Sequence, residues 1–480
     1  MSNTGLFARR PLCAVLLSLG LAGCAVGPDY QPRTDTARPL PQRLDTALYS
    51  SEQLQRDWWR QFQDPQLDQL MDQALSRNRD IHQAQARLLE ARAELDERQL
   101  DRLPTVTAEG GYSRSKAQDN PGPAGERNLA KSYRAGLDAQ WEIDLFGRLQ
   151  RLSEAAAARG EAAEADVAQA RIVVAAEVAR NYFEMRGAQR QLDVARAALE
   201  NQQNMVQVVT AMVGVGRGAA DELASAEAEQ ARQQAALPPL ETRVQLARYR
   251  LAVLVAAQPS ELPALIRPVA LEPLVTRLPI GNLADLLRQR PDIASAERDL
   301  AASTADIGAV TAELYPRLDL GGFLGFVAIR GSDLGSSSSR AFSVLPGVSW
   351  PALHLASVKA RQRQVQARQQ GAHAHYEQVV LQAVAEAEGA LTTYSQSQQR
   401  LGDLLQAARH SARAASLAQV RYQAGAAPYL LALQAQRTRL QSEDALAQAD
   451  TASYINVVAL YKALGGGWRT PIRVTVVNRD

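Results

Sequence analysis

The sequence predicts an α+β membrane protein made of two tandem copies of one unit, a β-hairpin followed by a long helical hairpin. One observation behind this prediction is an internal repeat of short motifs, and a second is alternating polar and apolar sequence in each copy. The third is composition. No proline occurs between Pro123 and Pro238 or between Pro351 and Pro428, and alanine, glutamine, arginine, glutamate and leucine fill both spans. That composition is typical of long helices.

Residues 1–23 are predicted to be a lipoprotein signal peptide and no part of the fold. Arg9 and Arg10 give it a positive start. Residues 11–21 form an apolar run that is too short to cross a bilayer core of ~30 Å as a helix.

Cys24 follows Ala22 and Gly23 in a pattern that resembles the lipobox of bacterial lipoproteins. In that class the cysteine thiol receives a diacylglycerol, the leader is cut off, and the new amino group is acylated. Cys24 is therefore the predicted N-palmitoyl and S-diacylglycerol cysteine, and Ala25 resembles the second residue of proteins sorted to the outer membrane. Two or three acyl chains anchor a protein stably where one does not. The alternative is an ordinary signal peptide with an incidental cysteine.

Removal of the leader changes the charge balance of the chain. The leader carries Arg9 and Arg10 but no acid, which leaves 51 basic and 51 acidic residues. A formally neutral mature chain argues against nucleic acid as a partner. The two cysteines are Cys13, which is removed, and Cys24, so no disulfide is expected within the mature chain.

Two segments precede the first repeat. Residues 24–57 are rich in proline, threonine, arginine and glutamine, and they predict a lipidated extended tether. Residues 58–77 begin with Trp58 and Trp59 and continue with apolar residues at helical spacing behind a helix-start signal at Asp64. We interpret the two tryptophans as core residues.

The repeat is visible in motifs that recur in the same order. Arg-Asp-Ile at 79–81 recurs as Pro-Asp-Ile at 291–293, and a proline follows each isoleucine at the same distance. Glycine-containing turns recur 209 positions apart, as Gly216 and Gly425 show. The chain is therefore a tandem duplication. Repeat 1 spans 78–256 and repeat 2 spans 291–464, and the remaining segments are 257–290 and 465–480.

Each repeat begins with a charged, alanine-containing helical stretch, and two strands follow it at about 103–144 in repeat 1 and about 316–351 in repeat 2. Apolar and polar residues alternate along both, and one face is strongly polar. This pattern is typical of a transmembrane barrel strand. A soluble antiparallel hairpin with one wet face gives the same alternation, so alternation alone leaves both interpretations open.

Long helices follow each hairpin. They are predicted at about 147–212 and 219–256 in repeat 1, and at about 355–424 and 428–464 in repeat 2. At ~1.5 Å per residue the first helix of each pair reaches on the order of 100 Å, which no single soluble core requires. Apolar residues at steps of seven, such as those from Leu433 to Tyr461, favour coiled-coil packing.

Four strands cannot close a barrel in lipid, because an open edge leaves backbone groups unpaired at several kcal/mol each. The smallest bacterial barrels have eight strands. If these strands lie in a membrane, several chains must share one barrel. Three chains give twelve strands, and two or four satisfy the same constraint.

Five segments carry a resemblance to a known family, and they occur in that family's order. The five are 24–30 (Cys-Ala-Val-Gly-Pro-Asp-Tyr), 58–67 (Trp-Trp-Arg-Gln-Phe-Gln-Asp-Pro-Gln-Leu), 141–148 (Trp-Glu-Ile-Asp-Leu-Phe-Gly-Arg), 421–425 (Arg-Tyr-Gln-Ala-Gly) and 461–468 (Tyr-Lys-Ala-Leu-Gly-Gly-Gly-Trp). Together they resemble the TolC-like outer membrane factors, specifically the lipidated branch of multidrug (RND-type) efflux. The resemblance covers nearly the whole mature chain.

The resemblance implies a homotrimer with a twelve-stranded β-barrel in the outer membrane and a long α-helical barrel in the periplasm. A mixed equatorial belt would use residues 58–77, 257–290 and 465–480. The implied function is a passive outer-membrane duct for small molecules. Its implied partners are outer-membrane lipids, a periplasmic membrane fusion adaptor and, through the adaptor, an inner-membrane RND-type pump. No cofactor or metal is implied.

The helical tips are the expected working part of such a duct. We expect Arg421 and Tyr422 to help hold the periplasmic end closed through bonds to a neighbouring helix. The alternative is that they only stabilise a helix end, Arg421 through the helix dipole and Tyr422 through packing. The residues expected at the adaptor contact are Gly216, Gly218, Gly425 and Ala427.

The sequence also departs from the family's pattern. Pro-Ala-Leu-His at 351–354 replaces a Pro-Leu-Phe-Asp-like run, and Leu431 and Gln434 stand where the family has aspartates. Repeat 2 also lacks the glycine that Gly147 supplies in repeat 1. If opening is asymmetric, the second helical hairpin is where it is expected.

Other functions fit the sequence less well. An enzyme is not expected, because the sequence holds no metalloprotease, phosphate-loop or nucleophile-elbow pattern, and His373 and His375 point apart on a helix. A periplasmic structural coiled-coil lipoprotein would not need two alternating hairpins. A duct for polypeptide secretion remains an alternative cargo assignment.

Overall fold

The computed structural model describes residues 25–32, 47–52, 54–118, 127–261 and 277–467. The signal peptide at 1–23, Cys24 and the last residues of 465–480 lie outside these ranges. The described residues fall into two compact units. The sheet unit takes its residues from 1–33, 87–163 and 295–377, and the helical unit takes them from 34–86, 164–294 and 378–480.

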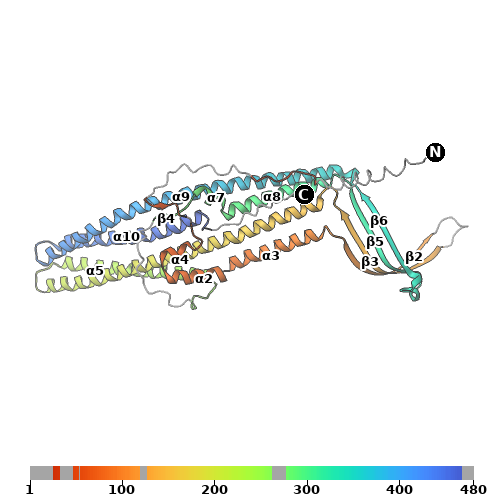
Figure 1. Cartoon of the computed structure of the whole chain (residues 1–480). Helices are drawn as coiled ribbons and strands as arrows, with labels where there is room; N and C mark the ends of the chain where they lie inside the picture. The colour runs from red at the N-terminus through yellow and green to blue at the C-terminus, as the bar shows by residue number, and fades with distance from the viewer. Residues whose placement is uncertain (1–24, 33–46, 53, 119–126, 262–276, 468–480) are drawn as a thin grey trace. The chain divides into compact units, whose positions relative to one another are not determined.

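The sheet unit is built on one antiparallel sheet in the order β2-β3-β5-β6 (Figure 1). Its strands are β2 (Thr105–Gln118), β3 (Arg127–Ile143), β5 (Arg317–Ala328) and β6 (Arg340–Ser349). β3 of repeat 1 pairs with β5 of repeat 2, with Ile143 opposite Leu318. The duplication therefore yields one continuous four-stranded sheet in place of two separate hairpins.

The outer strands of this sheet, β2 and β6, each have one strand partner within the described chain. Their other edges expose backbone N–H and C=O groups along 14 and 10 residues. In water such edges invite pairing with another chain, and in lipid they require it. The backbone hydrogen bonding of the sheet is therefore incomplete in one protomer, and strands of another chain must complete it.

The register separates two faces of different polarity. Thr107 lies opposite Asp138, and Arg317 lies opposite Ser349, all on one face. The other face is apolar and exposed in the protomer, with Val106, Tyr112, Leu137, Leu324, Phe342 and Val344 among its side chains. A polar face and an exposed apolar face are the two surfaces of a barrel wall between lumen and lipid.

Five long helices carry most of the remaining chain: α3 (Arg79–Leu100), α4 (Arg148–Gly214), α8 (Pro291–Ala312), α9 (Leu355–Gln423) and α10 (Tyr429–Ala463). α4 has 67 residues and α9 has 69, which matches the lengths that the proline-free spans predict. Within the described ranges, no helix is both long enough and apolar enough to cross a bilayer.

The predicted return helix at 219–256 is wrong as one continuous helix. The structure has α5 (Ala220–Ala235) and α6 (Leu237–Leu254), which meet at Ala236. Pro238 lies in the first turn of α6 and has no N–H to continue the hydrogen-bond ladder of α5. The chain therefore restarts with proline at a helix position that tolerates it.

An aromatic core lies beside the first short elements of the helical unit, η1 (Trp58–Phe62) and α2 (Pro65–Arg77). Trp58 is 5% exposed, and its ring centroid lies 5.2 Å from that of Tyr461. Phe62 packs edge-on against Phe183 at 4.7 Å. The interpretation of the tryptophan pair as core residues is confirmed.

Asp64 fixes the start of α2 and ties it to α4. Its carboxylate accepts the Gln66 amide at 2.9 Å, as an N-cap residue should, and also accepts the Tyr182 hydroxyl. Arg186 adds a hydrogen bond of 2.6 Å to the Gln66 side chain. Burial, together with the Asp64 contact, raises the pKa of Tyr182.

Residues 47–52 are packed against the helical unit's own elements, although the extended tether predicted at 24–57 includes them. β1 (Tyr49–Ser50) pairs in parallel with β4 (Leu278–Pro279), just before α7 (Leu283–Arg288). The Tyr49 hydroxyl donates to the Leu391 carbonyl at 3.1 Å. Backbone pairing and burial of Tyr49 outweigh the extended character that the composition suggests.

Short 3₁₀ turns complete the described elements: η2 (Gly331–Asp333) and η3 (Ser337–Ser339) between β5 and β6, and η4 (Ala352–His354) before α9. The heptad prediction for α10 is confirmed at four positions, because Leu433, Ala447, Tyr454 and Tyr461 are buried.

Gly187 offers a test of the close approach of α4 and α10. A Cβ at this position would lie 2.2–2.8 Å from side-chain atoms of Thr451, whose hydroxyl is already bonded to Ala447. Gly187→Ala should destabilise the protein by about 1–3 kcal/mol through overpacking. Gly402→Ala, on an exposed position of α9 with no atom nearby, should stabilise it by about 0.5–1 kcal/mol. Thermal melting of the purified protein measures both, and equal effects would contradict the close packing.

Candidate functional site

Residues 25–32, here the anchor segment, are docked on the sheet unit. The Val26 amide donates to the Phe146 carbonyl at 3.2 Å. Gly27 has a left-handed backbone with φ +97°, and a Cβ there would lie 2.5 Å from the Gly308 Cα on α8. Only glycine satisfies both conditions. The first described residues of the segment predicted as an extended tether are therefore held in place.

A buried arginine strengthens this docking. Arg151 of α4, whose side chain is 5% exposed, pairs with Asp29 at 2.5 Å and with Glu154 at 2.8 Å. Burial alone would lower the pKa of Arg151, but hydrogen bonds to the two carboxylates raise it, so the guanidinium stays charged. The charge pair fixes the anchor segment against the first turn of α4.

Tyr30 holds the C-terminal part of the anchor segment in place. Its hydroxyl donates to Glu297 at 2.9 Å, and its ring packs on Ala158, Ala301 and Ala302. Burial, followed by the charge of Glu297, raises the pKa of Tyr30. Backbone and side-chain contacts thus hold the anchor segment from Val26 to Tyr30.

The same contacts explain why repeat 1 has a glycine that repeat 2 lacks. Gly147 has φ +76°, and a Cβ there would lie 2.6 Å from the Ala25 Cβ. The corresponding residue in repeat 2, 209 positions later, is Ala356. Ala25, which is bonded to Cys24, therefore contacts the turn that follows the last residue of β3, Ile143.

The two helical tips lie at the same end of the helical unit (Figure 1), and their turns have one geometry. In the first tip the Gly216 amide donates to the Val213 carbonyl at 3.0 Å, and in the second the Gly425 amide donates to the Tyr422 carbonyl at 2.9 Å. Gly216 has φ +74° and Gly425 has φ +71°. This is the glycine C-cap that closes a helix, as the sequence predicts.

The tip residues expected to contact an adaptor lie on or near the surface. Gly216 and Gly425 are exposed, whereas Gly218 and Ala427 are partly buried. A Cβ on Gly218 would lie 3.0–3.3 Å from Val213 and from the backbone of Met212, so the first turn is the tighter one.

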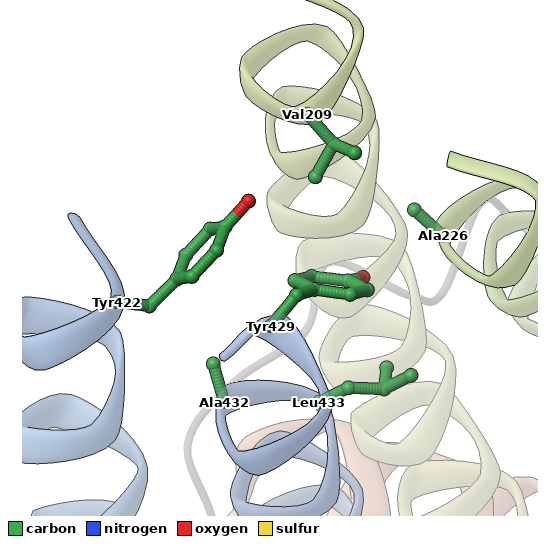
Figure 2. Close-up of a cluster of buried hydrophobic side chains, with 6 residues drawn as sticks. All are labelled: Val209, Ala226, Tyr422, Tyr429, Ala432 and Leu433. Atoms are coloured by element: carbon green, nitrogen blue, oxygen red, sulfur yellow. The ribbon is translucent and has the colours of Figure 1, made fainter. Parts of the chain in front are cut away.

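The structure separates the two predicted gate residues. Tyr422 is 5% exposed and belongs to a cluster at the tips, in which Figure 2 shows its ring turned toward α4. Its hydroxyl lies 3.3 Å from the Met212 sulfur. Burial, then the charge of Glu222, raises the pKa of Tyr422. The other members of the cluster are Val209, Ala226, Tyr429, Ala432 and Leu433.

Arg421, by contrast, is exposed on α9. Among the described residues no carboxylate forms an ion pair with its guanidinium, and its backbone carbonyl accepts the Ala426 amide at 2.8 Å. Adjacent residues thus face opposite ways. Tyr422 packs inside the described protomer, whereas the Arg421 side chain is exposed to solvent.

A carboxylate that sequence reasoning missed joins the two helical hairpins. Glu229 of α5 is 4% exposed and accepts Arg437 of α10 through Nε at 2.8 Å and Nη2 at 2.6 Å. Near it the Gln202 side chain donates to the Ala226 carbonyl at 2.9 Å and to the Tyr429 hydroxyl at 3.4 Å. Glu229 and Arg437 are 208 residues apart, so no local pattern could reveal the pair.

Repeat symmetry shows that this ion pair is built once per chain. The positions 209 residues from Glu229 and Arg437 hold Thr438 and Ala228, which cannot form the same bond. Metal binding has no comparable basis. In the part of the chain that the structure describes, no group of three His, Cys, Asp or Glu side chains gathers in a metal-binding arrangement.

The fold and its surfaces define an outer-membrane channel protomer, and comparisons with known proteins agree. The family model described as outer membrane efflux protein matches residues 70–257 and 282–466, so the chain belongs to that family. Members of this class trimerise and work with a periplasmic adaptor and an inner-membrane pump. The family resemblance, the fold class and the outer-membrane location predicted from sequence are confirmed.

Individual relatives are similar along almost their whole length. The pyoverdine export outer membrane protein OpmQ of Pseudomonas aeruginosa is 31% identical, covering 96% of this chain and 97% of OpmQ. The cation efflux system protein CusC of Escherichia coli is 29% identical, covering 96% and 98%. The solved structure of the outer-membrane channel OprN is 43% identical with a TM-score of 0.87, covering 93% of this chain and 100% of OprN. A periplasmic structural lipoprotein is thereby excluded.

Gly27→Val tests the docking of the anchor segment. The new side chain cannot adopt the backbone without strain and overlaps Gly308, so the segment should detach. The Val26 amide should then exchange with deuterium at least tenfold faster. Gly335→Val is the matched control, because Gly335 has φ +93° but no atom within 4 Å of its Cβ position. Unchanged exchange at Val26 in the first variant would rule out the docking.

Arg437→Met tests the ion pair between the hairpins. Removing the guanidinium leaves the Glu229 carboxylate buried with its remaining contacts on α5, which should cost about 1–3 kcal/mol. Arg439→Met is the control, because Arg439 pairs with Glu443 one turn away at the surface, and such pairs contribute about 0–1 kcal/mol. Adding Glu229→Gln to Arg437→Met should recover part of the loss. Equal melting of the two single variants would contradict the role of Glu229.

Proposed function

We propose that this chain is the lipid-anchored outer-membrane duct of a tripartite multidrug efflux system. Three copies enclose a passage that conducts small molecules passively, without catalytic chemistry of its own, from an inner-membrane RND-type pump and a periplasmic membrane fusion adaptor to the exterior. The homotrimer also contacts outer-membrane lipids.

One observation supports this proposal more than any other. The four-stranded sheet has a polar face, an exposed apolar face and two edges without partners in the described part of the protomer. Closing those edges with two further copies gives twelve strands, with the apolar faces toward lipid and the polar faces around a water-filled passage.

The cargo is proposed from the variety among the relatives. Proteins of nearly equal similarity to this chain are named for export of pyoverdine, cations and toluene. Ducts so alike with cargoes so different are consistent with selection by the pump. We therefore assign small molecules as the cargo class.

The lipid anchor is proposed at Cys24. The anchor segment that follows it is fixed by Asp29–Arg151 and by the Gly27 contact, and Ala25 lies against Gly147 after β3. The residue next to the proposed lipidation site thus lies after the end of β3, which suits an anchor at the surface of a leaflet.

The tips are proposed as the adaptor contact and the closure. Gly216, Gly218, Gly425 and Ala427 present little side-chain bulk, which suits close packing of another helical protein. We assign Arg421 the bond to a neighbouring chain and Tyr422 the packing that holds α9 in position for it.

Gene deletion tests the proposed function. Loss of this chain should lower the minimal inhibitory concentrations of several chemically unrelated compounds at least fourfold, because the pump then has no exit. Expression of the intact gene should restore them, and expression of Cys24→Ala should restore them only in part. A deletion strain that keeps its full resistance beside every pump and adaptor it encodes, yet fails to export a polypeptide, would favour the secretion alternative.

Single-channel conductance tests the proposed closure. Arg421→Ala should raise the conductance of the purified trimer several-fold, because it removes a bond between chains. Tyr422→Ala should do so by loosening the cluster, and Tyr422→Phe should change little. Arg409→Ala, also exposed on α9, serves as control. Unchanged conductance in both alanine variants at 421 and 422 excludes them as gate residues.

A further inference from the structure

The polar face of the sheet carries one buried aromatic side chain, Phe323 of β5. The register places it opposite Asp138 of β3, on the face that also holds Thr107 and Arg134. The other aromatic side chains of the described strands β2, β3, β5 and β6 lie on the apolar face, where Phe342 is 81% exposed. Phe323 is only 9% exposed, so it is packed on a face where packing is otherwise sparse.

The wall beneath Phe323 is built to receive its ring. Gly136 and Gly325 lie opposite each other across β3 and β5. A Cβ on Gly136 would lie 2.6 Å from the ring, and one on Gly325 would lie 2.9 Å from it. Two facing glycines leave room for the ring to approach the backbone closely, an arrangement that also shields the sheet where glycine leaves it uncovered.

A guanidinium also lies over the same ring. The Arg134 Cζ is 4.0 Å from the centroid of Phe323, within cation–π distance. The Asp138 carboxylate pairs with the Arg134 Nη2 and holds the group over the ring. The side chain of Arg134 is nevertheless 42% exposed, so solvent reaches it despite both contacts.

We propose that this stack, Phe323 with Arg134 and Asp138, is a transient binding site in the duct for planar aromatic molecules. A guanidinium stacks on aromatic planes with either face. Phe323 already contacts the Arg134 guanidinium, and the exposed part of that side chain leaves room for a further planar group. Three copies would place three such sites around the passage.

The charged groups around the site favour recognition of a molecule by its flat shape over recognition by its charge. Asp138 compensates the charge of Arg134, and Glu109, opposite Gly136 on the same face, adds a second carboxylate nearby. A bare anion therefore gains little at the site. What the site offers is a flat, delocalised surface, and its binding must stay weak, because a conducting path needs sites that release what they bind.

The inference rests on the proposed function only in requiring that the polar face line the passage. Current block measured with the trimer in planar bilayers tests it. 2-Naphthoate is added on the β-barrel side, and its saturated analogue, decahydro-2-naphthoate, has the same charge and nearly the same size. The aromatic probe should block the current at least fivefold more strongly.

Two variants locate the site. Arg134→Gln removes the guanidinium, and Phe323→Leu keeps the glycines covered while removing the ring. Both should reduce block by 2-naphthoate to the level of the saturated analogue. Phe342→Leu, on the exposed apolar face, should leave it unchanged. Equal block by both probes in the wild type, or undiminished aromatic block in Arg134→Gln, overturns the proposal.

Saturation-transfer NMR tests binding at this site independently of whether the trimer conducts. The measurement detects contact of 2-naphthoate with the detergent-solubilised trimer whether or not the trimer conducts. Transfer that depends on Arg134 supports the site even if no current is observed, whereas an absence of conductance by itself counts against the duct. Transfer that is equal in wild type and Arg134→Gln counts against the site alone.

Discussion

The fold depends on one constraint, that backbone N–H and C=O groups cannot remain unpaired in lipid. A single protomer satisfies this constraint for β3 and β5 but leaves the outer edges of β2 and β6 open. Each open group would cost several kcal/mol in a bilayer. The sheet of one protomer therefore cannot close by itself. Members of this family form trimers, in which two further protomers supply the missing strands. The polar and apolar faces of the sheet can face the passage and the lipid only when the barrel is closed.

The duplication explains the overall arrangement of strands and helices. Positions at which the two repeats differ explain contacts that occur in one repeat alone. Gly147 is a glycine because Ala25 lies against it, and its counterpart in repeat 2, Ala356, carries the Cβ that Gly147 must omit. Glu229 pairs with Arg437 once per chain, on the side where the first hairpin meets the second. Both departures serve contacts that only one copy of the repeat makes. Two identical copies could form the sheet and the helical hairpins. They could not form the contact of Gly147 with Ala25 or the single ion pair between Glu229 and Arg437.

What the sequence could predict was local. Alternation predicted the strands, absence of proline predicted α4 and α9, and glycine predicted the two tip turns. The break at Ala236 was also local, because Pro238 follows it, and one continuous helix was the wrong inference. Contacts between distant residues were beyond reach: Asp29 and Arg151 are 122 positions apart, and neither lies in a pattern that requires a partner. For the same reason the sequence could not show that Tyr422 faces inward while Arg421 faces outward.

Disulfide cross-linking of the open edges tests whether neighbouring protomers share one barrel. The mature chain has no free thiol if Cys24 is acylated, so cysteines introduced on β2 at Thr107 and, in a panel, along β6 at Ser343, Gly347 and Ser349 can be oxidised without background. At the matching register, β2 of one chain should bond β6 of the next and give covalent trimers on denaturing gels. Monomers at every register, or bonds only within one chain, would contradict a barrel shared between protomers.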